Sequence, residues 1–317
     1  MLAIAIAFLA PGTARAWCRM TTSMIPSTPG TCVRDGVPLA WGHRCTSYRF
    51  FVDGTPDLSF DDLRAVAALS FGAWGDVTCP SGARPGLVAH EGTDATGAPQ
   101  LSYCDRSEYN IGGPNVATIV FVRDWSTRPM YDPSAYAVTT VWHNTRTGEI
   151  YDVDMEYNEQ RGPFTRCGDV PCSDGRVDLQ DVMTHEAGHW FGMGHTPDDA
   201  AATMYFAAPA GEIEKRTLQP DDIGGFCDAY EFAAFGPTCD DRPRGGLKLT
   251  CGATACGPDP QSLQFSPGAT GALGAGPPVI CHGGAATCGV AGAGRSDWLL
   301  CWAILATLAV VRRRARK

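Results

Sequence analysis

The sequence predicts an α+β domain followed by a long irregular region. Residues 60–74 carry apolar side chains at helical spacing, and we expect a second helix at residues 177–191. Residues 116–122 are continuously apolar, as in a central strand of a sheet. Gly and Pro make up 60 of the 317 residues, well above the usual ~12%, which predicts long irregular connections. This length is enough for one domain with attached segments.

The N-terminal segment has the pattern of a secretory signal peptide. Residues 2–10 are apolar, a Pro-Gly breaker follows, and residues 14–16 (Ala-Arg-Ala) fit a cleavage site. We therefore expect residues 1–16 to be removed and the mature chain to begin at Trp17. A buried N-terminal helix is the alternative interpretation. Under the first interpretation the protein is exported.

The first part of the mature chain combines an irregular segment, a strand and a helix. Residues 17–40 are rich in Pro, Ser, Thr and Gly, which favours irregular structure. Residues 48–52 form a short apolar and aromatic run typical of a strand. Ser59 is a suitable N-cap for the helix at residues 60–74, whose first turn holds two aspartates that suit the helix dipole.

A hairpin and a final helix complete the predicted domain. The strand at residues 116–122 is expected to lie inside the sheet because both of its faces are apolar. Residues 136–142 and 150–157 flank a polar turn that contains Gly, which predicts a hairpin. Residues 220–232 have the pattern of a last helix.

The C-terminal region divides into a stalk and a tail. Residues 237–287 have the Gly-, Pro- and Cys-rich composition of a disulfide-containing stalk. Residues 298–311 are apolar, shorter than the ~17–25 residues of a membrane span, and precede a basic cluster. With the small residues around Cys288, residues 288–317 resemble the sorting tails of myxobacterial surface proteins. The resemblance implies transient membrane anchoring, cleavage near Cys288 and display at the cell surface; a permanent anchor is the alternative.

Charge and cysteine content limit the function classes. Residues 17–294 hold 18 basic and 33 acidic residues, a net charge of −15 that disfavours a nucleic-acid partner. Setting aside Cys288 and Cys301 leaves 12 of the 14 cysteines, an even number compatible with six disulfides in an oxidising compartment. Residues 167 and 172 are close enough to form one such bond, as are residues 251 and 256. A cysteine zinc site would need paired short spacings that the chain lacks.

Residues 185–195 (HEAGHWFGMGH) carry the chemistry of a metal site. His185 and His189 are four positions apart, so both rings project from one face of the expected helix. Glu186 lies beside them, within reach of a zinc-activated water. Gly192 permits a positive φ that ends the helix and brings His195 to the third ligand position. Three ligands leave the fourth position open, as in a catalytic zinc site.

Two other interpretations of these histidines are weaker. A structural zinc site generally uses four Cys or His ligands and would give Glu186 no role. Three buried histidines without a metal would each need a separate hydrogen-bond partner.

This motif resembles the HExxHxxGxxH pattern of the metzincin metallopeptidases, with Met204 as the Met-turn residue. Residues 41–230, about 60% of the chain, resemble the matrixin branch, from YRFFVDGTPDLSFDDLRAVAALSFGAWGDVT through TTVWHNTRTGEIYDVDMEYN to TLQPDDIGGFCDAY. The resemblance implies a matrixin-like domain at residues 41–236 with a mixed, twisted sheet, an active-site helix and a final helix. The sequence departs from that family at two points. The prodomain cysteine motif is absent, and Phe206 replaces the proline that follows the Met-turn methionine by two residues.

The resemblance implies substrate contacts as well. One strand is expected to be the exposed sheet edge to which a peptide substrate adds as a further strand. This strand consists of Ala137, Val138, Thr139, Thr140, Val141 and Trp142. Residues 205–218 are expected to form one wall of the pocket that selects a substrate side chain beside the zinc.

Together these features predict a secreted or surface-attached zinc endopeptidase with Glu186 as general base. Its partner would be a protein or peptide substrate, taken either broadly or as one specific target. A surface binding or adhesion module with a non-catalytic zinc site is the alternative, which the intact Glu186 disfavours. Acidic pairs such as Asp152/Asp154 and Asp221/Asp222 are candidate Ca²⁺ ligands, with solvated carboxylates as the alternative.

Overall fold

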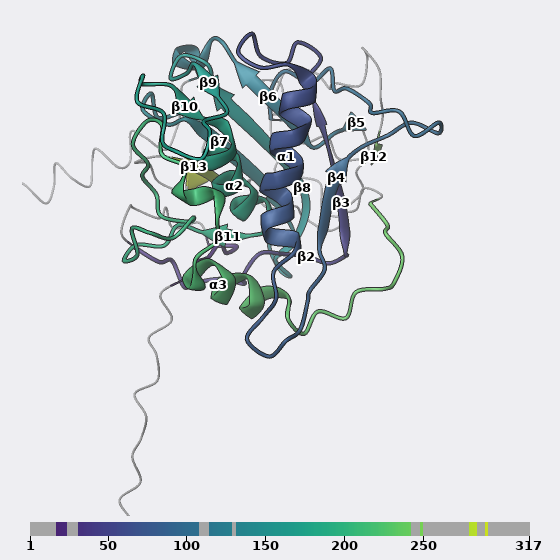
Figure 1. Cartoon of the computed structure of the whole chain (residues 1–317). Helices are drawn as coiled ribbons and strands as arrows, with labels where there is room; N and C mark the ends of the chain where they lie inside the picture. Colours follow the sequence, from purple (N-terminus) through teal and green to yellow (C-terminus); the bar gives the residue numbers. More distant parts are fainter. Residues whose placement is uncertain are drawn as a thin grey trace, which may run out of the picture.

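A mixed β-sheet forms the centre of the structure (Figure 1). The computed structural model describes residues 17–23, 31–107, 114–128, 131–241, 248–249, 279–283 and 289–290. Neighbouring strands follow the order β14-β13-β7-β8-β6-β3-β4, and β2 pairs with β8. Their bounds are β2 (Ala40–Trp41), β3 (Cys45–Phe50), β4 (Val88–Glu91), β6 (Thr118–Val122), β7 (Ala137–His143), β8 (Glu149–Asn158), β13 (Val279–Gly283) and β14 (Gly289–Val290).

Strand directions agree with the expected mixed sheet and hairpin. Strands β3, β4, β6 and β8 run parallel to one another, whereas β7 is antiparallel to β8. In the turn between them, Asn144 Oδ1 accepts bonds from the backbone amides of Arg146 and Thr147, and Gly148 has a φ of +73°. The hairpin and the interior position of the apolar strand β6 are therefore confirmed.

Three short pairs lie outside this sheet: β1 (Cys18–Arg19) with β11 (Met193–Gly194), β9 (Phe164–Thr165) with β10 (Val177–Asp178), and β5 (Pro114–Asn115) with β12 (Lys248–Leu249).

The helices α1 (Phe60–Gly75) and α2 (Leu179–Trp190) pack beside each other against the sheet (Figure 1). Helix α3 (Pro220–Tyr230) lies at one end of the sheet, and the short 3₁₀ turns η1 (Trp125–Thr127) and η2 (Glu214–Arg216) lie in loops. Ser59 caps α1 as expected, its side chain accepting a bond from the backbone N–H of Asp62 at 3.2 Å.

Aromatic side chains fill the space between α1, α2 and the sheet. The rings of Phe71 in α1 and Trp190 in α2 lie 5.2 Å apart, and Tyr48 of β3 stacks on Phe71. Trp74 is fully buried, and its indole N–H donates to Thr184 O at 2.8 Å. Each buried side chain of this size stabilises the fold by about 2–3 kcal/mol. This core fixes α2, which carries the candidate metal ligands, against the rest of the domain.

Disulfides connect distant parts of this core. The described bonds are Cys18–Cys32, Cys45–Cys239, Cys79–Cys227 and Cys167–Cys172. The pairing of Cys167 with Cys172 is the one that the sequence predicts. Disulfide use, rather than a cysteine zinc site, is therefore confirmed for these residues. Cys251, Cys256 and Cys288 lie outside the described residues.

Several sequence predictions also fall outside the described residues, namely the signal peptide at residues 1–16 and the apolar run at residues 298–311. In the part of the chain that the structure describes, no helix combines the length and the apolar composition needed to span a membrane. Within the stalk expected at residues 237–287, the strands β12 and β13 are present and pair with strands of the preceding domain.

Candidate active site

The helix α2 begins at an aspartate that is both a cap and an ion-pair partner. Asp178 is buried, and its Oδ1 accepts the backbone N–H of Asp181 at 2.8 Å. The Arg216 guanidinium donates two further bonds to this carboxylate, at 2.8 and 2.5 Å. These contacts fix the first turn of α2, so the directions of His185 and His189 two to three turns later are fixed as well.

The helix α2 ends at a glycine that turns the chain back. Gly192 has a φ of +81°, and a side chain there would press against the backbone oxygen of Leu39. The next two residues form β11, which pairs antiparallel with β1 (Cys18–Arg19). This turn brings His195 beside the helix, as the spacing predicts.

Three imidazole rings meet at one point. His185 Nε2 lies 3.2 Å from His195 Nε2, and His189 Nε2 lies 3.1 Å from that same atom. His185 and His189 are buried, whereas His195 is half-buried. Among the described residues, these three form the one cluster of His, Cys, Asp or Glu with ligand atoms close enough to hold a metal ion.

Backbone carbonyls fix the protonation of two of these rings. His185 Nδ1 lies 2.6 Å from Thr203 O, and His189 Nδ1 lies 2.8 Å from Met193 O. Because a carbonyl oxygen only accepts, each Nδ1 carries the hydrogen and each Nε2 keeps its lone pair. Burial and the neighbouring His189 hold the pKa of His185 well below its ordinary value, so this ring is neutral.

The donor set fits a zinc ion. Converging nitrogen lone pairs repel one another unless a cation lies between them, and neutral imidazole is a preferred ligand of Zn²⁺. Three protein donors with one half-buried member also match a catalytic site, in which one position is left for water or substrate.

Met204 packs on the active-site helix at Gly188, the residue before His189. A Cβ built on Gly188, between the two helical ligands, would clash with Met204 Sδ and with the ring of Trp74. The methionine side chain therefore packs against the bare backbone of α2 at Gly188. This packing against the active-site helix is compatible with the Met-turn role that the family resemblance implies for Met204.

Asp222 holds the turn that carries Met204. Its buried carboxylate accepts the backbone N–H groups of Thr203 and Met204 at 2.8 and 2.9 Å, and that of Gln219 at 2.8 Å. Thr203 in turn presents its carbonyl to His185. Asp222 thus fixes a ligand through one intermediate residue. The sequence assigned no such role to Asp222, although its place at the third position of a helix that starts with Pro220 is a known capping signal.

Glu186 lies buried beside the three ligands. Thr139 Oγ1 donates to Glu186 Oε2 at 2.5 Å, whereas Oε1 has no hydrogen-bond partner among the described residues. Burial raises the pKa of Glu186 to about 8, and the bond from Thr139 acts in the opposite direction. The sequence placed Thr139 on the substrate strand but did not identify its contact with Glu186.

A small cavity of about 20 Å³ adjoins His185. Tyr205, Phe206, Ala207, Ala208 and Lys215 form much of its lining, so residues from the expected 205–218 wall do border the metal cluster. Lys215 is buried, and its Nζ pairs with Glu212 at 3.1 Å. Asp181 also lines the cavity and accepts the backbone N–H of Lys215 at 2.8 Å, and burial and the nearby Glu212 raise the pKa of Asp181 to about 7.

The prediction of an open sheet edge at Ala137–Trp142 is wrong for the described chain. Strand β7 contains these residues, but β13 pairs with it on the side away from β8. The physical reason is that a strand distant in sequence supplies the backbone partners that an exposed edge lacks. The role of β7 in substrate binding stays a prediction.

The calcium prediction gains no support, because the acidic pairs bond to groups of the chain itself. Asp154 accepts the backbone N–H of Thr118 at 3.0 Å, and Asp152 accepts that of Val153 at 3.0 Å. Asp222 is engaged as described above, and Asp221 accepts the hydroxyl of Thr196. The described histidines elsewhere also have local contacts: His43 with Cys45 O, His90 with Asp241 and His143 with Val141 O.

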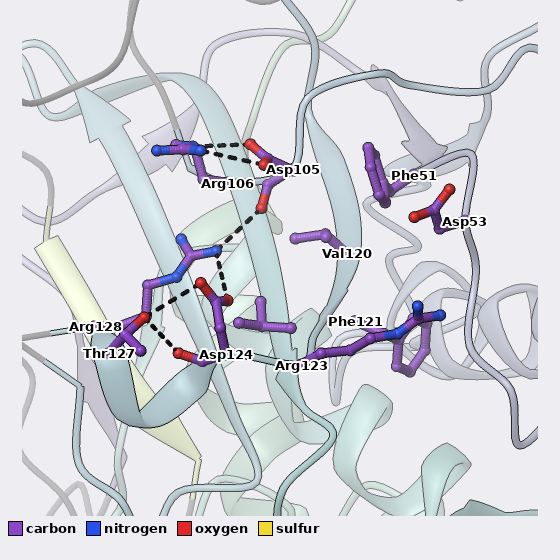
Figure 2. A pocket seen from close by; sticks show the side chains of 11 residues that line it. Phe51, Asp53, Asp105, Arg106, Val120, Phe121, Arg123, Asp124, Thr127 and Arg128 are labelled. Carbon is purple, nitrogen blue, oxygen red and sulfur yellow. Dashed lines mark hydrogen bonds and ion pairs between the residues drawn. The ribbon is translucent and has the colours of Figure 1, made fainter.

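A larger cavity of about 370 Å³ lies away from the histidines, where β3, β6 and η1 meet (Figure 2). Apart from Asp53, its charged side chains are paired with one another or with the rim. Arg106 pairs with Asp105, Arg128 with Asp124 and Glu156, and Arg123 with Glu159. This balance of charge gives the cavity no evident preference for an ionic ligand.

Comparison with known proteins finds a family similarity for the part of the chain that holds the site. Residues 122–231 match the family model Peptidase_M10, Matrixin. The match extends from the end of β6 through β7, β8, α2 and α3, and it includes all three histidines, Glu186 and Met204. No curated protein matches the chain. The family match supports a zinc metallopeptidase.

Proposed function

Because this domain is a matrixin-like metzincin, we propose that the chain is an exported zinc endopeptidase with Glu186 as its general base. The observation that carries the proposal is the convergence of three Nε2 atoms beside a buried carboxylate with one unpartnered oxygen. A structural zinc site would need neither the carboxylate nor its free oxygen.

The chain's own residues divide the work of peptide hydrolysis between them. When bound, zinc polarises the scissile carbonyl and makes a water acidic enough to lose its proton near neutral pH. His185, His189 and His195 hold the ion, and the backbone carbonyls behind two of the rings fix their direction. Glu186 Oε1 accepts the proton of the attacking water and later delivers it to the leaving amine. Thr139 keeps the other oxygen of this carboxylate in place.

Substrate recognition would depend mainly on hydrogen bonds between the backbone of the peptide and the backbone of the enzyme. We propose that a peptide substrate adds to β7 as a strand, since β7 carries the Thr139 that contacts Glu186. Side-chain selection would take place at the small cavity beside His185. Broad digestion of unfolded proteins and processing of one target both remain compatible with this arrangement.

Export to the cell exterior is part of the proposal. The disulfides seen among the described residues are characteristic of an oxidising compartment and support it. The proposed signal peptide at residues 1–16 and the sorting tail at residues 288–317, with its cysteine at position 288, would supply the route.

The test compares the purified chain with the Glu186→Gln variant. Gln keeps the size of Glu and an oxygen that accepts the Thr139 hydroxyl, but it does not take a proton from water. We expect one zinc per chain in both proteins by elemental analysis. Cleavage of an unfolded protein should fall ~10²–10⁴-fold in the variant. Equal cleavage by both would contradict the role of Glu186, and a chain that binds no zinc would contradict the site.

A further inference from the structure

The strand β13 occupies the side of β7 to which a substrate would add. All five residues of β13 pair antiparallel with β7, from Val279 opposite Val141 to Gly283 opposite Ala137. Figure 1 shows β13 beside β7 and close to α2, although some 140 residues separate the two strands in the chain.

The pairing is centred on the residue that contacts the general base. Cys281, in the middle of β13, is the register partner of Thr139, whose hydroxyl donates to Glu186. Ile280 and His282 pair with the residues on either side, Thr140 and Val138. The backbone of β13 therefore passes the part of β7 that lies nearest the catalytic centre.

One strand edge accepts one partner. In a sheet, each backbone N–H and C=O on a given side of a strand bonds to a single neighbouring strand. While β13 is paired, a peptide therefore has no free backbone groups on β7 to which it can add. The two occupants exclude each other.

We propose that Val279–Gly283 is an intramolecular occupant of the substrate edge that keeps the enzyme latent until this strand is displaced. The inference rests on the proposed function, because it takes β7 to be the substrate strand. A segment joined to the same chain competes at an effective concentration of the order of millimolar, so it outcompetes a dilute peptide without needing high intrinsic affinity. Opening of this pairing leaves the described core intact, since, among the residues whose side chains the structure describes, the buried cluster around α1 and α2 lies within residues 20–230.

The test uses the full chain with Ile280→Pro and, as the matched control, Ile280→Val. Strand β13 lies between β7 and β14, and proline is not tolerated in an interior strand because it donates no ladder bond. Valine retains strand preference. Zinc content and circular dichroism establish that both variants keep the fold.

Hydrogen exchange on β7 provides a readout that needs no activity. Alternate amides of β7 point to β8 and to β13, so the first set is an internal control for the second. In the parent and in Ile280→Val, both sets should be protected. In Ile280→Pro, the set that faces β13 should exchange at least 10-fold faster, whereas the set that faces β8 should not change. Free exchange of the outward set in the parent would overturn the pairing, whatever the activity.

Peptide cleavage then tests latency. We expect Ile280→Pro to cleave an unfolded protein at least 10-fold faster than the parent, and Ile280→Val to match the parent. Equal cleavage by all three proteins would overturn latency and leave the peptidase proposal intact. Absence of cleavage from all three, with zinc bound, would contradict the peptidase proposal itself and latency with it.

Discussion

At the scale of single residues, the hydroxyl of Thr139 determines which oxygen of Glu186 is free. It donates to Oε2, and Oε1 is left without a partner among the described residues. A hydrogen bond to a carboxylate favours the ionised form, and a general base must be ionised to accept a proton. Thr139 is therefore a positioning residue that also opposes the rise in pKa caused by burial of Glu186.

Replacement of this hydroxyl by a methyl group should slow catalysis more than binding. Hydrogen bonds to charged groups contribute about 1.5–3 kcal/mol, which corresponds to roughly 10–100-fold in rate. We expect Thr139→Val to lower kcat by this factor with KM nearly unchanged, and to move the rising limb of the pH–rate profile to higher pH. Thr139→Ser, which keeps the hydroxyl, should restore most of the rate. Steady-state kinetics across pH measure both effects, and a serine variant as slow as the valine variant would contradict the assignment.

The residues that the sequence predicts well are those whose relation is local. His185, Glu186 and His189 share one helix and His195 follows a glycine turn, so their spacing alone indicates that they lie together. The contact of Thr139 with Glu186 joins positions 47 residues apart, and the bond of Met204 to Asp222 spans 18. No spacing rule encodes such contacts, because the packing of β7 and α3 against α2 creates them.

At the scale of elements, the helix α2 shows a conflict between the low helix propensity of glycine and the packing that requires a glycine at position 188. Glycine in a helix interior costs about 1 kcal/mol relative to alanine, yet Gly188 lies between two metal ligands. Any larger residue would displace Met204 or Trp74. Gly72 in α1 has open space around the position of a Cβ, so at that site only the helix propensity of the residue affects stability.

Opposite effects are therefore expected from the same substitution in two helices. Gly72→Ala should raise the free energy of unfolding by about 0.5–1 kcal/mol. Gly188→Ala should lower it by about 1–3 kcal/mol through overpacking, and it should also weaken zinc binding because Met204 and Thr203 move together. Urea unfolding and zinc titration of both variants provide the measurement. A stabilised Gly188→Ala protein would show that Met204 does not pack on this helix face.

The sequence predicts most elements to within a few residues. Helix α1 is expected at 60–74 and found at Phe60–Gly75, and the final helix is expected at 220–232 and found at Pro220–Tyr230. These patterns are local, since apolar periodicity and caps are properties of short segments. The strand β13 lies in a Gly- and Pro-rich region that favours a stalk, and its partner is the distant β7. Composition contains no information about such a partner.

At the scale of the whole molecule, disulfides hold together segments that the chain order separates. Cys79, just after α1, bonds to Cys227 in α3 across 148 residues, whereas Cys167 and Cys172 close a loop of only 5. Cys79, Cys227 and Cys167 are buried, whereas Cys172 is half-buried. In the chain-entropy account, the stabilisation grows with the logarithm of loop length because a longer closed loop removes more conformations from the unfolded chain.

The two disulfides should therefore differ in their contribution to stability. From loop length, Cys79→Ala/Cys227→Ala should lower the free energy of unfolding by about 5 kcal/mol, and Cys167→Ala/Cys172→Ala by about 2 kcal/mol. Urea unfolding of the oxidised proteins measures both losses, and each double variant serves as the other's control because each removes one disulfide and two sulfur atoms. Equal losses would show that the bond between Cys79 and Cys227 acts through local packing. The expected inequality would instead mean that this bond restrains the unfolded chain as a whole, which suits a catalytic domain proposed to work outside the cell.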